Sequence, residues 1–338
     1  MMNFMNNAGE NFKRILDELN RQAQHKEDFV VPANQIRMRD DGNFTFQTLF
    51  TNAAASPATE WAENQMYQKL ELPARFMRRC PSDLRATNFN YFAERLPAEE
   101  EWLLRTYRSR SNQLGHMIRG ALSKDYSRFD DEQFLGMIES MIGTEEDHRI
   151  SYWYRDERGM HLRIVFPDLT RNIGRTLEGR PDVHMVGVHL SNSEVGARSV
   201  TIQPMVYRLV CSNGLMRWTN DGEVFKQRHI HLREREMYSR VAEAFTAAIK
   251  AGDDMLERAL AAKEVKVENP LDFIKTLAKD KKYSQSMTDT ITSTYMAEPG
   301  DSLFYVMQAM TRAAQTLQGD ARVELEQDAG ELLAKVAV

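Results

Sequence analysis

Cysteine is scarce in this chain of 338 residues, which contains only Cys80 and Cys211. Two cysteines without a neighbouring group of cysteine or histidine ligands indicate neither a disulfide framework nor a structural zinc site. The sequence also lacks an apolar run of about 18 residues, and no basic stretch followed by an apolar segment opens it. We therefore expect neither membrane insertion nor secretion, and the sequence predicts a cytoplasmic protein.

Several catalytic motifs are absent as well. No glycine-rich segment leads into Lys-Ser or Lys-Thr in the arrangement that cradles phosphates, and no G-x-G-x-x-G follows a strand-like run. A nucleotide-hydrolysing motor is therefore not expected. The G-x-S-x-G elbow is missing too, and Cys211 has no histidine close to it in sequence, which favours a buried apolar role for this cysteine. We predict a protein that is not an enzyme and that has no catalytic residues, cofactor or metal.

Arginine is what the sequence does have, and charge is segregated along the chain. The net charge is −5, yet residues 149–240 hold 15 basic and 10 acidic side chains, and 14 of the basic ones are arginine. Residues 75–128 hold 11 basic and 6 acidic side chains, whereas residues 129–148 hold seven acids and neither lysine nor arginine. The guanidinium group suits phosphate and can stack on bases, so this bias favours an anionic partner. Ion pairing with acidic neighbours is the alternative.

Alternating apolar residues predict an antiparallel sheet in the middle of the chain. Two alternating runs flank a polar turn and indicate a hairpin over residues 149–166, and further strands are expected at 183–190 and 200–210. Pro204 predicts that the last of these is an edge strand or is interrupted there. Beyond this region we expect helices at 10–24, from Pro57 to Pro73 and from Asp130, a hairpin at 36–50 with an Asp-Gly-Asn turn, and two extended runs within 101–122.

These patterns predict an α+β fold with a twisted antiparallel β-sheet core, packed helices and a helical C-terminal region. We divide the chain into an N-terminal α/β segment packed on the core (1–100), an antiparallel β-rich core (101–235) and an acidic helical region (236–338). The helical spacing of apolar residues after His229 supports the last boundary. This acidic region either covers the sheet or serves oligomerisation or partner binding.

Two motifs carry a resemblance to a known family. The first, VHMVGVHLSNSEVGARSVTIQPMVYRLVCSNGLMRW from Val183 to Trp218, joins two strand-like runs to a polar Ser-Asn-Ser-Glu turn and a Cys-x-Asn-Gly turn. The second is IRGALSKDYSR, from Ile118 to Arg128. With these motifs the chain resembles, over roughly residues 60–235, a phage- and plasmid-encoded family known as domain of unknown function 932. Its order of hairpin, helix and antiparallel sheet is also similar to single-strand annealing proteins of the Rad-fifty-two type.

The second resemblance implies ring or filament assembly and a basic groove that holds one DNA strand without nucleotide hydrolysis. A family of phages and mobile elements implies a role in replication or recombination. Our hypothesis is therefore a phage-type protein of the host cytoplasm that binds single-stranded DNA and promotes its annealing. We expect a homo-oligomer that works with phage or host replication or recombination proteins.

Arginines interleaved with aromatic residues predict the binding surface, because guanidinium groups can follow a phosphate backbone while aromatic faces receive bases. The predicted nucleic-acid-binding residues are Arg105, Arg108, Arg119, Lys124, Tyr126, Arg128, Trp153, Arg155, Arg163, Asn192, Arg208 and Arg217. In the alternative interpretation the aromatic residues fill the core and the arginines face water. The turn residues 191–194 either bind substrate or satisfy the turn backbone themselves.

Two other functions stay open. A metal-dependent nuclease would use His229 and His231, whose spacing places both imidazoles on one side of a strand, together with distant carboxylates. The basic residues around these histidines favour phosphate contact or solvation over metal binding. A third possibility is a module that binds a host protein through the acidic helical tail.

Overall fold

The chain folds around a six-stranded antiparallel sheet, which we call the main sheet. The computed structural model describes residues 11–47, 55–108, 116–144, 147–176, 178–209, 213–216, 225–230 and 233–336. The strands of the main sheet are β6 (Arg149–Arg155), β7 (Met160–Arg175), β8 (Pro181–Asn192), β9 (Val200–Arg208), β10 (Asn213–Met216) and β11 (Phe225–Gln227). Their order is β10-β9-β8-β7-β6, with β11 also paired to β9. The predicted α+β class is confirmed.

Alternation gives the main sheet two different faces. Leu162 and Ile164 of β7 and Val188 of β8 are fully buried in the largest apolar cluster of the protein. Because successive side chains of a strand point to opposite sides, His161 and Arg163 lie on the other face. One face of the sheet is therefore apolar, whereas the other carries polar side chains together with a small apolar cluster of Val165, Met185, Met205 and Met216.

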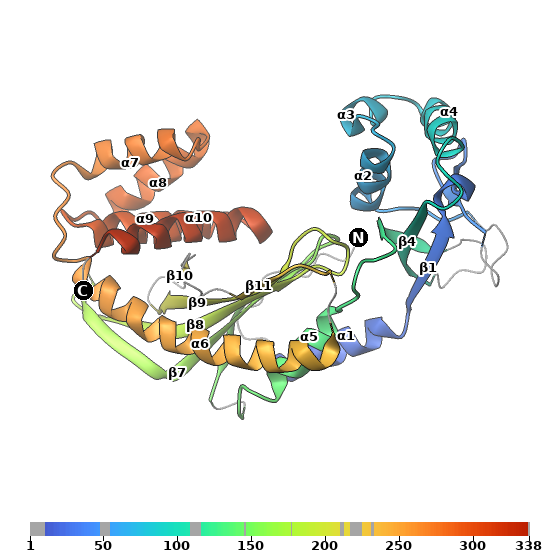
Figure 1. Cartoon of the computed structure of the whole chain (residues 1–338). Coiled ribbons are helices and arrows are strands. Elements are labelled where there is room, and N and C mark those ends of the chain that lie inside the picture. Colours follow the sequence, from blue (N-terminus) through green and yellow to red (C-terminus); the bar gives the residue numbers. More distant parts are fainter. Residues whose placement is uncertain are drawn as a thin grey trace.

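Helix α6 (Glu234–Ala261) lies across the apolar face of the main sheet (Figure 1). Its Val241, Phe245 and Ala248 are buried in the same cluster as the strands. The helix approaches β8 so closely that a Cβ on Gly252 would lie 2.6 Å from Val186 Cγ1, which only glycine allows without a shift. Helices α1 (Phe12–Ala23) and α5 (Asp131–Glu139) add to this layer, and both agree with the prediction.

The C-terminal helices lie on the opposite side of the main sheet from α6 (Figure 1). They are α7 (Pro270–Asp280), α8 (Gln285–Ala297), α9 (Leu303–Ala314), α10 (Gly319–Glu331) and the short 3-10 helix η2 (Leu332–Lys335). Met255 near the end of α6, Phe304 of α9 and Leu325 of α10 belong to the same apolar cluster as the strands. The predicted helical region is thus packed on the sheet. No helix in the described ranges is long and apolar enough to cross a membrane.

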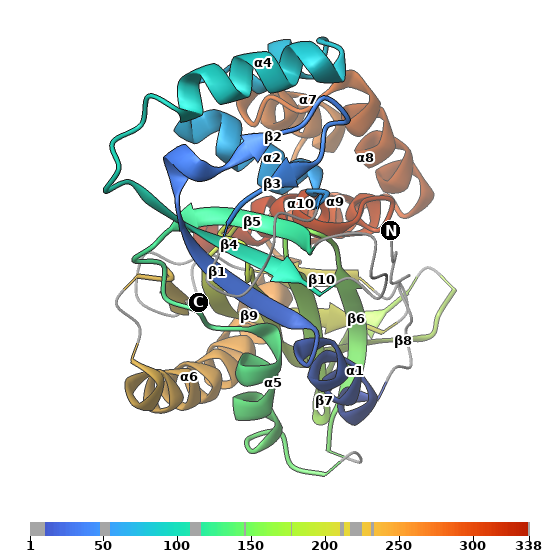
Figure 2. The same ribbon diagram turned by 90° about the vertical axis from the view of Figure 1, so that its right-hand side faces the viewer.

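An N-terminal lobe has a separate sheet and a separate apolar core, and Figure 2 turns this lobe toward the viewer. Its three strands, in the order β1-β4-β5, are β1 (Lys26–Pro32), β4 (Glu101–Tyr107) and β5 (Met117–Ser123). The remaining elements are η1 (Ala33–Gln35), the hairpin β2 (Arg37–Met38) and β3 (Phe44–Thr45), α2 (Glu60–Lys69), α3 (Ala74–Met77) and α4 (Ser82–Ala93). The extended runs expected within 101–122 therefore form β4 and β5, which pair with each other, and β4 also pairs with β1; neither belongs to the main sheet.

Three local features differ from the sequence pattern. Helix α4 was not predicted, because apolar residues stand on both its sides: Phe89 is buried while Tyr91 and Phe92 are exposed. Strand β9 is not an edge strand, because it pairs with β8 on one side and with two short strands on the other. The pairing on this second side is interrupted at Pro204: β11 pairs with residues 200–202 and β10 with residues 205–208. The Asn-Gly pair expected to form a tight turn begins strand β10.

Candidate nucleic-acid interface

The polar face of the main sheet carries hydrogen-bonding side chains on three adjacent strands. Opposed residues on β7, β8 and β9 are His161 with Ser191, Arg163 with His189, Ser191 with Thr201 and His189 with Gln203. Side chains directly opposite each other on antiparallel strands share a face and lie about 5 Å apart. All six side chains are buried, so they form one continuous polar patch beneath the C-terminal helices.

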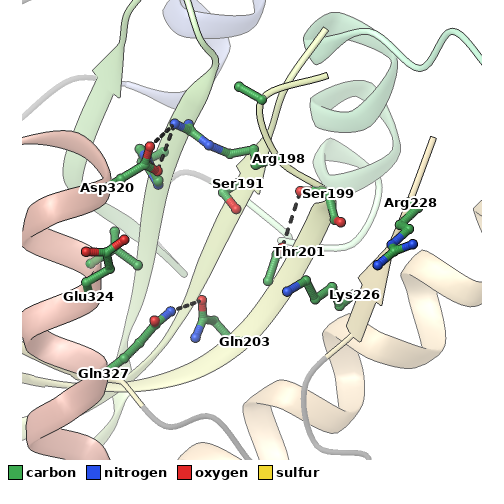
Figure 3. A pocket seen from close by; sticks show the side chains of 13 residues that line it. Ser191, Arg198, Ser199, Thr201, Gln203, Lys226, Arg228, Asp320, Glu324 and Gln327 are labelled. Carbon is green, nitrogen blue, oxygen red and sulfur yellow. Dashed lines mark hydrogen bonds and ion pairs between the residues drawn. The ribbon is translucent and has the colours of Figure 1, made fainter. Parts of the chain in front are cut away.

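Helix α10 and strand β11 stand on either side of this patch and leave a cavity of about 380 Å³ between them (Figure 3). The sheet supplies the floor. The side chains that matter for its chemistry are Asp320, Glu324 and Gln327 on α10, Lys226 and Arg228 at β11, and His161, Ser191, Thr201 and Gln203 on the floor. The cavity is therefore lined mainly by polar side chains, with Lys226 and Arg228 opposite Asp320 and Glu324.

Asp320, at the start of α10, joins the helix to the sheet. It accepts hydrogen bonds from His161 Nε2 at 3.2 Å and from Arg198 Nη2 at 2.8 Å. Burial acts to raise the pKa of Asp320, but the hydrogen bond from His161 and the charge of Arg198 outweigh it and hold the pKa well below its usual range. Burial lowers the pKa of His161 to about 4, so its imidazole is neutral at pH 7.

The neutral His161 ring determines the tautomers of both histidines, His161 and His189, beneath the cavity. Because His161 Nε2 donates to Asp320, its Nδ1 accepts, and the donor 3.3 Å away is His189 Nε2. His189 Nδ1 is then an acceptor, and it has no hydrogen-bond partner in the described part of the chain. The neighbouring Gln203 accepts from Gln327 at 3.1 Å, while its own Nε2 has no partner there either. Such buried polar atoms call for a water or a ligand.

Helix α10 is held on the polar face by its glycine and by a buried ion pair. Gly319 has a φ of +57°, and a Cβ there would lie 2.9 Å from the Tyr154 ring, so glycine fits this start of the helix. Its N–H donates to Tyr152 Oη at 3.1 Å. Further along, Glu326 accepts from Arg163 Nη1 at 3.0 Å, and both side chains are almost fully buried. The wall of the cavity is thus fixed relative to its floor.

Exposed cations gather beside the cavity, where two distant segments meet. Residues 126–128 run beside residues 228–230, joined by a backbone hydrogen bond of 3.0 Å and by Tyr126 stacked on His229 with ring centroids 5.0 Å apart. The exposed cations on or next to these segments are Lys124, Arg128, Lys226 and Arg228. We call this surface the basic edge. Lys124 and Arg128 each have one carboxylate neighbour and stay about half exposed.

Five of the predicted binding residues are instead arginines in the interior that face carboxylates. The pairs are Arg105 with Asp130, Arg119 with Glu194, Arg155 with Asp131, Arg163 with Glu326, and Arg208 with Asp182. A guanidinium group that is paired and removed from water is not presented to a phosphate at the surface. The ion-pair alternative accounts for these five positions in this conformation.

Three of these arginines meet Lys26 at Glu194, and we call this group the Glu194 cluster. Lys26 Nζ lies 2.7 Å from Glu194 Oε1, Arg119 Nη1 lies 2.6 Å from Oε2, and Arg155 Nη2 lies 3.3 Å from Oε1. Arg105 donates to the Glu194 carbonyl at 2.8 Å. Burial acts to raise the pKa of Glu194, but the surrounding cations hold it well below its usual range. The cluster joins the N-terminal lobe to the main sheet.

The other predicted residues are divided between core and surface. Arg108, Lys124 and Arg128 are exposed. Trp153 lies in the apolar core, and Asn192 is buried, with Nδ2 donating to Phe129 O at 3.0 Å and to Asp131 at 2.9 Å. Tyr126 donates its hydroxyl to Ser193 O at 2.9 Å. Arg217 lies outside the described residues.

The residues of the nuclease alternative are only partly described. His229 is buried, its Nδ1 lies 3.3 Å from Ser127 O, and burial lowers its pKa to about 4. His231 lies outside the described residues. Asp130, Glu132 and Glu194 have carboxylate oxygens within 4.8 Å of one another, as a metal site would need. The ammonium of Lys26 lies 2.5 to 3.2 Å from all three, so a protein cation already neutralises them.

A comparison with known protein families matches the main sheet and most of the C-terminal helices. Residues 119–329 match the model of the family described as domain of unknown function (DUF932). The chain belongs to this family, as its two motifs predicted. The match begins later than the expected residue 60 and continues into α10, so the residues that line the cavity lie within it. No curated protein and no solved structure matches, and the resemblance to annealing proteins of the Rad-fifty-two type is not confirmed.

Proposed function

We propose that the protein binds single-stranded DNA at the basic edge and promotes annealing or recombination without hydrolysing nucleotides. The observation that carries the proposal is the position of the edge: two of its exposed cations, Lys226 and Arg228, border a cavity lined by hydrogen-bonding side chains. Cations along a groove neutralise phosphates, and a polar recess beside them can receive an unpaired base. In a duplex the bases are already paired and stacked, so the arrangement favours a single strand.

The cellular setting follows from the proposed activity. Annealing brings two strands together, so the proposal includes a homo-oligomer that offers more than one basic edge. It also includes work in the host cytoplasm, beside phage or host proteins of replication or recombination. Native mass analysis of the free and DNA-bound protein tests this, and a protein that stays monomeric on DNA contradicts it.

The two alternatives have less support from the geometry. A nuclease would need the carboxylates of the Glu194 cluster for a metal, but Lys26 occupies the position between them. In the acidic tail, Asp320 and Glu326 of α10 are bonded to His161, Arg198 and Arg163 of the sheet, so these two carboxylates are not presented to a host protein. Metal-dependent cleavage of DNA by the purified protein would favour the nuclease over the proposed function.

Fluorescence anisotropy with single- and double-stranded DNA and RNA of equal length, across a salt series and without ATP, tests the proposal. Affinity for single-stranded DNA should fall steeply with salt, by roughly 0.7 in the logarithmic slope per contacted phosphate. The charge reversal Lys226→Glu/Arg228→Glu should weaken binding by roughly tenfold or more at low salt.

The matched control is Arg75→Glu/Arg79→Glu, which reverses two exposed arginines of the N-terminal lobe. This control should bind within about threefold of the wild type, because any general loss of positive charge is the same in both variants. Equal losses in the two double variants would show that only net charge matters. Absence of binding at low salt would reject the proposal outright.

A further inference from the structure

The cavity between α10 and β11 has two walls of opposite charge (Figure 3). Lys226 and Arg228 stand on one side, and Asp320 and Glu324 stand on the other. Asp320 is bonded to Arg198 and His161, whereas Glu324 is exposed and forms no ion pair with any residue that the structure describes. A ligand with an anionic group at one end and hydrogen-bond donors at the other would complement both walls.

The floor of the cavity adds directional groups. The Gln203 side chain is only 1% exposed, yet its Nε2 donor has no partner within the described ranges, although Gln203 lines the cavity. The hydroxyls of Ser191 and Thr201 line the same floor. A buried donor without an acceptor is unfavourable, so the floor is built for an occupant that accepts a hydrogen bond from Gln203.

We propose that this cavity holds one nucleotide unit of the bound strand, with its phosphate beside Lys226 and Arg228 and its unpaired base between Gln203 and Glu324. The inference rests on the proposed function, because it names the part of the strand that enters the protein. Base edges carry donors and acceptors next to each other, which is what a donor amide facing a carboxylate can read. A phosphate alone would accept from Gln203, but it would meet repulsion from Glu324 and would offer that carboxylate no donor.

The size of the cavity agrees with this occupant. Its volume of about 380 Å³ is at the small end of the range of roughly 300–1,000 Å³ found for ligand pockets. One nucleotide unit fits such a space, and a longer segment would have to continue along the basic edge outside it. Binding energy therefore has two parts: a salt-sensitive part from phosphates at the edge and a part from the enclosed base that depends less on salt.

Comparing a natural single strand with an abasic sugar-phosphate strand of equal length and charge separates the two parts. Wild-type protein should bind the natural strand roughly tenfold more tightly, and this ratio should persist as salt rises. Gln203→Leu and Glu324→Ala should each bring the ratio toward one while the affinity for the abasic strand is unchanged or, for Glu324→Ala, slightly improved. The control is Glu268→Ala, which removes an exposed carboxylate that does not line the cavity. It should keep the wild-type ratio.

The outcomes distinguish the inference from the function on which it rests. Equal affinity of the wild type for both strands, with the expected salt dependence, overturns the nucleotide cavity and leaves DNA binding in place. Binding of neither strand overturns both. Glu324 is exposed, so its variant decides the matter even if Gln203→Leu does not fold. A Glu324→Ala protein that keeps the full ratio shows that the base lies elsewhere.

Discussion

The Glu194 cluster and the basic edge are both rich in cations, but they differ in how far these cations are exposed to solvent. In the cluster, Lys26, Arg119 and Arg155 surround a carboxylate that is 3% exposed, and each cation lies within 3.3 Å of it. At the basic edge, Lys226 and Arg228 are exposed and border a cavity. The first arrangement joins two lobes, and the second can attract an anion from solution.

The difference shows why a count of arginines does not locate a binding surface. Arginine suits a buried ion pair for the same reason that it suits phosphate, because its planar fork matches two oxygens. What separates the two uses is whether the guanidinium group is buried together with its carboxylate, since Arg128 of the basic edge also lies near a distant carboxylate, Asp28, but stays about half exposed. Arg163 on β7 meets Glu326 on α10, and Arg105 on β4 meets Asp130 at the start of α5.

The largest effect is expected from Glu194→Ala. The substitution leaves several buried cations without their shared carboxylate, and unpaired buried charges of this kind cost about 3–5 kcal/mol of folding free energy. Thermal or urea unfolding should show this loss, which could prevent the two lobes from packing. Glu324→Ala, which removes a carboxylate at the exposed wall of the cavity, should change stability by less than about 0.5 kcal/mol. Similar stabilities of the two variants would contradict a structural role for the cluster.

A second prediction concerns pH and sits at the junction of the two regions, where His229 stacks on Tyr126. Burial lowers the pKa of His229 to about 4, against about 6.5 in an unfolded chain. The unfolded state therefore binds the extra proton first, and this contribution to stability is complete above pH 6.5 and is lost progressively as pH falls toward 4. The total is on the order of 3 kcal/mol for this shift.

His229→Phe keeps an aromatic ring on Tyr126 but cannot take up the proton. Measured by urea unfolding, the stability of this variant relative to wild type should therefore rise steadily between pH 6.5 and pH 4. His25→Phe, which replaces a histidine at an exposed position, is the matched control. A constant difference between His229→Phe and wild type over this range would show that His229 is not buried in its neutral form.

Much of the fold was predictable because its signals are local. The hairpin at 149–166 follows from alternation, and Asp130 is the N-cap of α5, with its backbone N–H donating to Gln133 of the first turn in a capping box. The pairing of β4 with β1 was not predictable, since nothing in either strand specifies a partner more than 70 residues away. Helix α4 was missed because its apolar residues do not form one stripe.

The candidate site was harder to predict than the fold. In β7, His161 and Arg163 alternate with apolar residues in the sequence. This alternation predicts a polar face of the strand, which another segment of the chain could cover. The sequence does not predict that α10 is the covering segment, because α10 lies more than 150 residues further along the chain. In the sequence, Arg228 is one of several basic residues in a polar run. Its place beside the cavity depends on the contact of its segment with Tyr126, which the sequence does not show.

The smallest effect is expected where the two regions come closest in sequence, in the motif that contains Arg119, Lys124 and Arg128. The double variant Lys124→Ala/Arg128→Ala removes two exposed cations of the basic edge and should leave thermal unfolding within about 0.5 kcal/mol of wild type. If each contacts one phosphate, the salt slope of DNA binding should fall by roughly 1.4.

Arg119→Ala is the counterpart, since its Nη1 lies 2.6 Å from Glu194 and its side chain is 8% exposed. It should lower stability, because a partner of the buried Glu194 is lost, and it should leave the salt slope of the folded protein unchanged. The two variants, only five residues apart in sequence, thus have opposite effects: Lys124→Ala/Arg128→Ala weakens DNA binding, whereas Arg119→Ala lowers stability. Anisotropy titrations and urea unfolding on both proteins check this exchange. A fall in salt slope with Arg119→Ala, without loss of stability, would move Arg119 from the cluster to the binding surface and erase the distinction between the two regions.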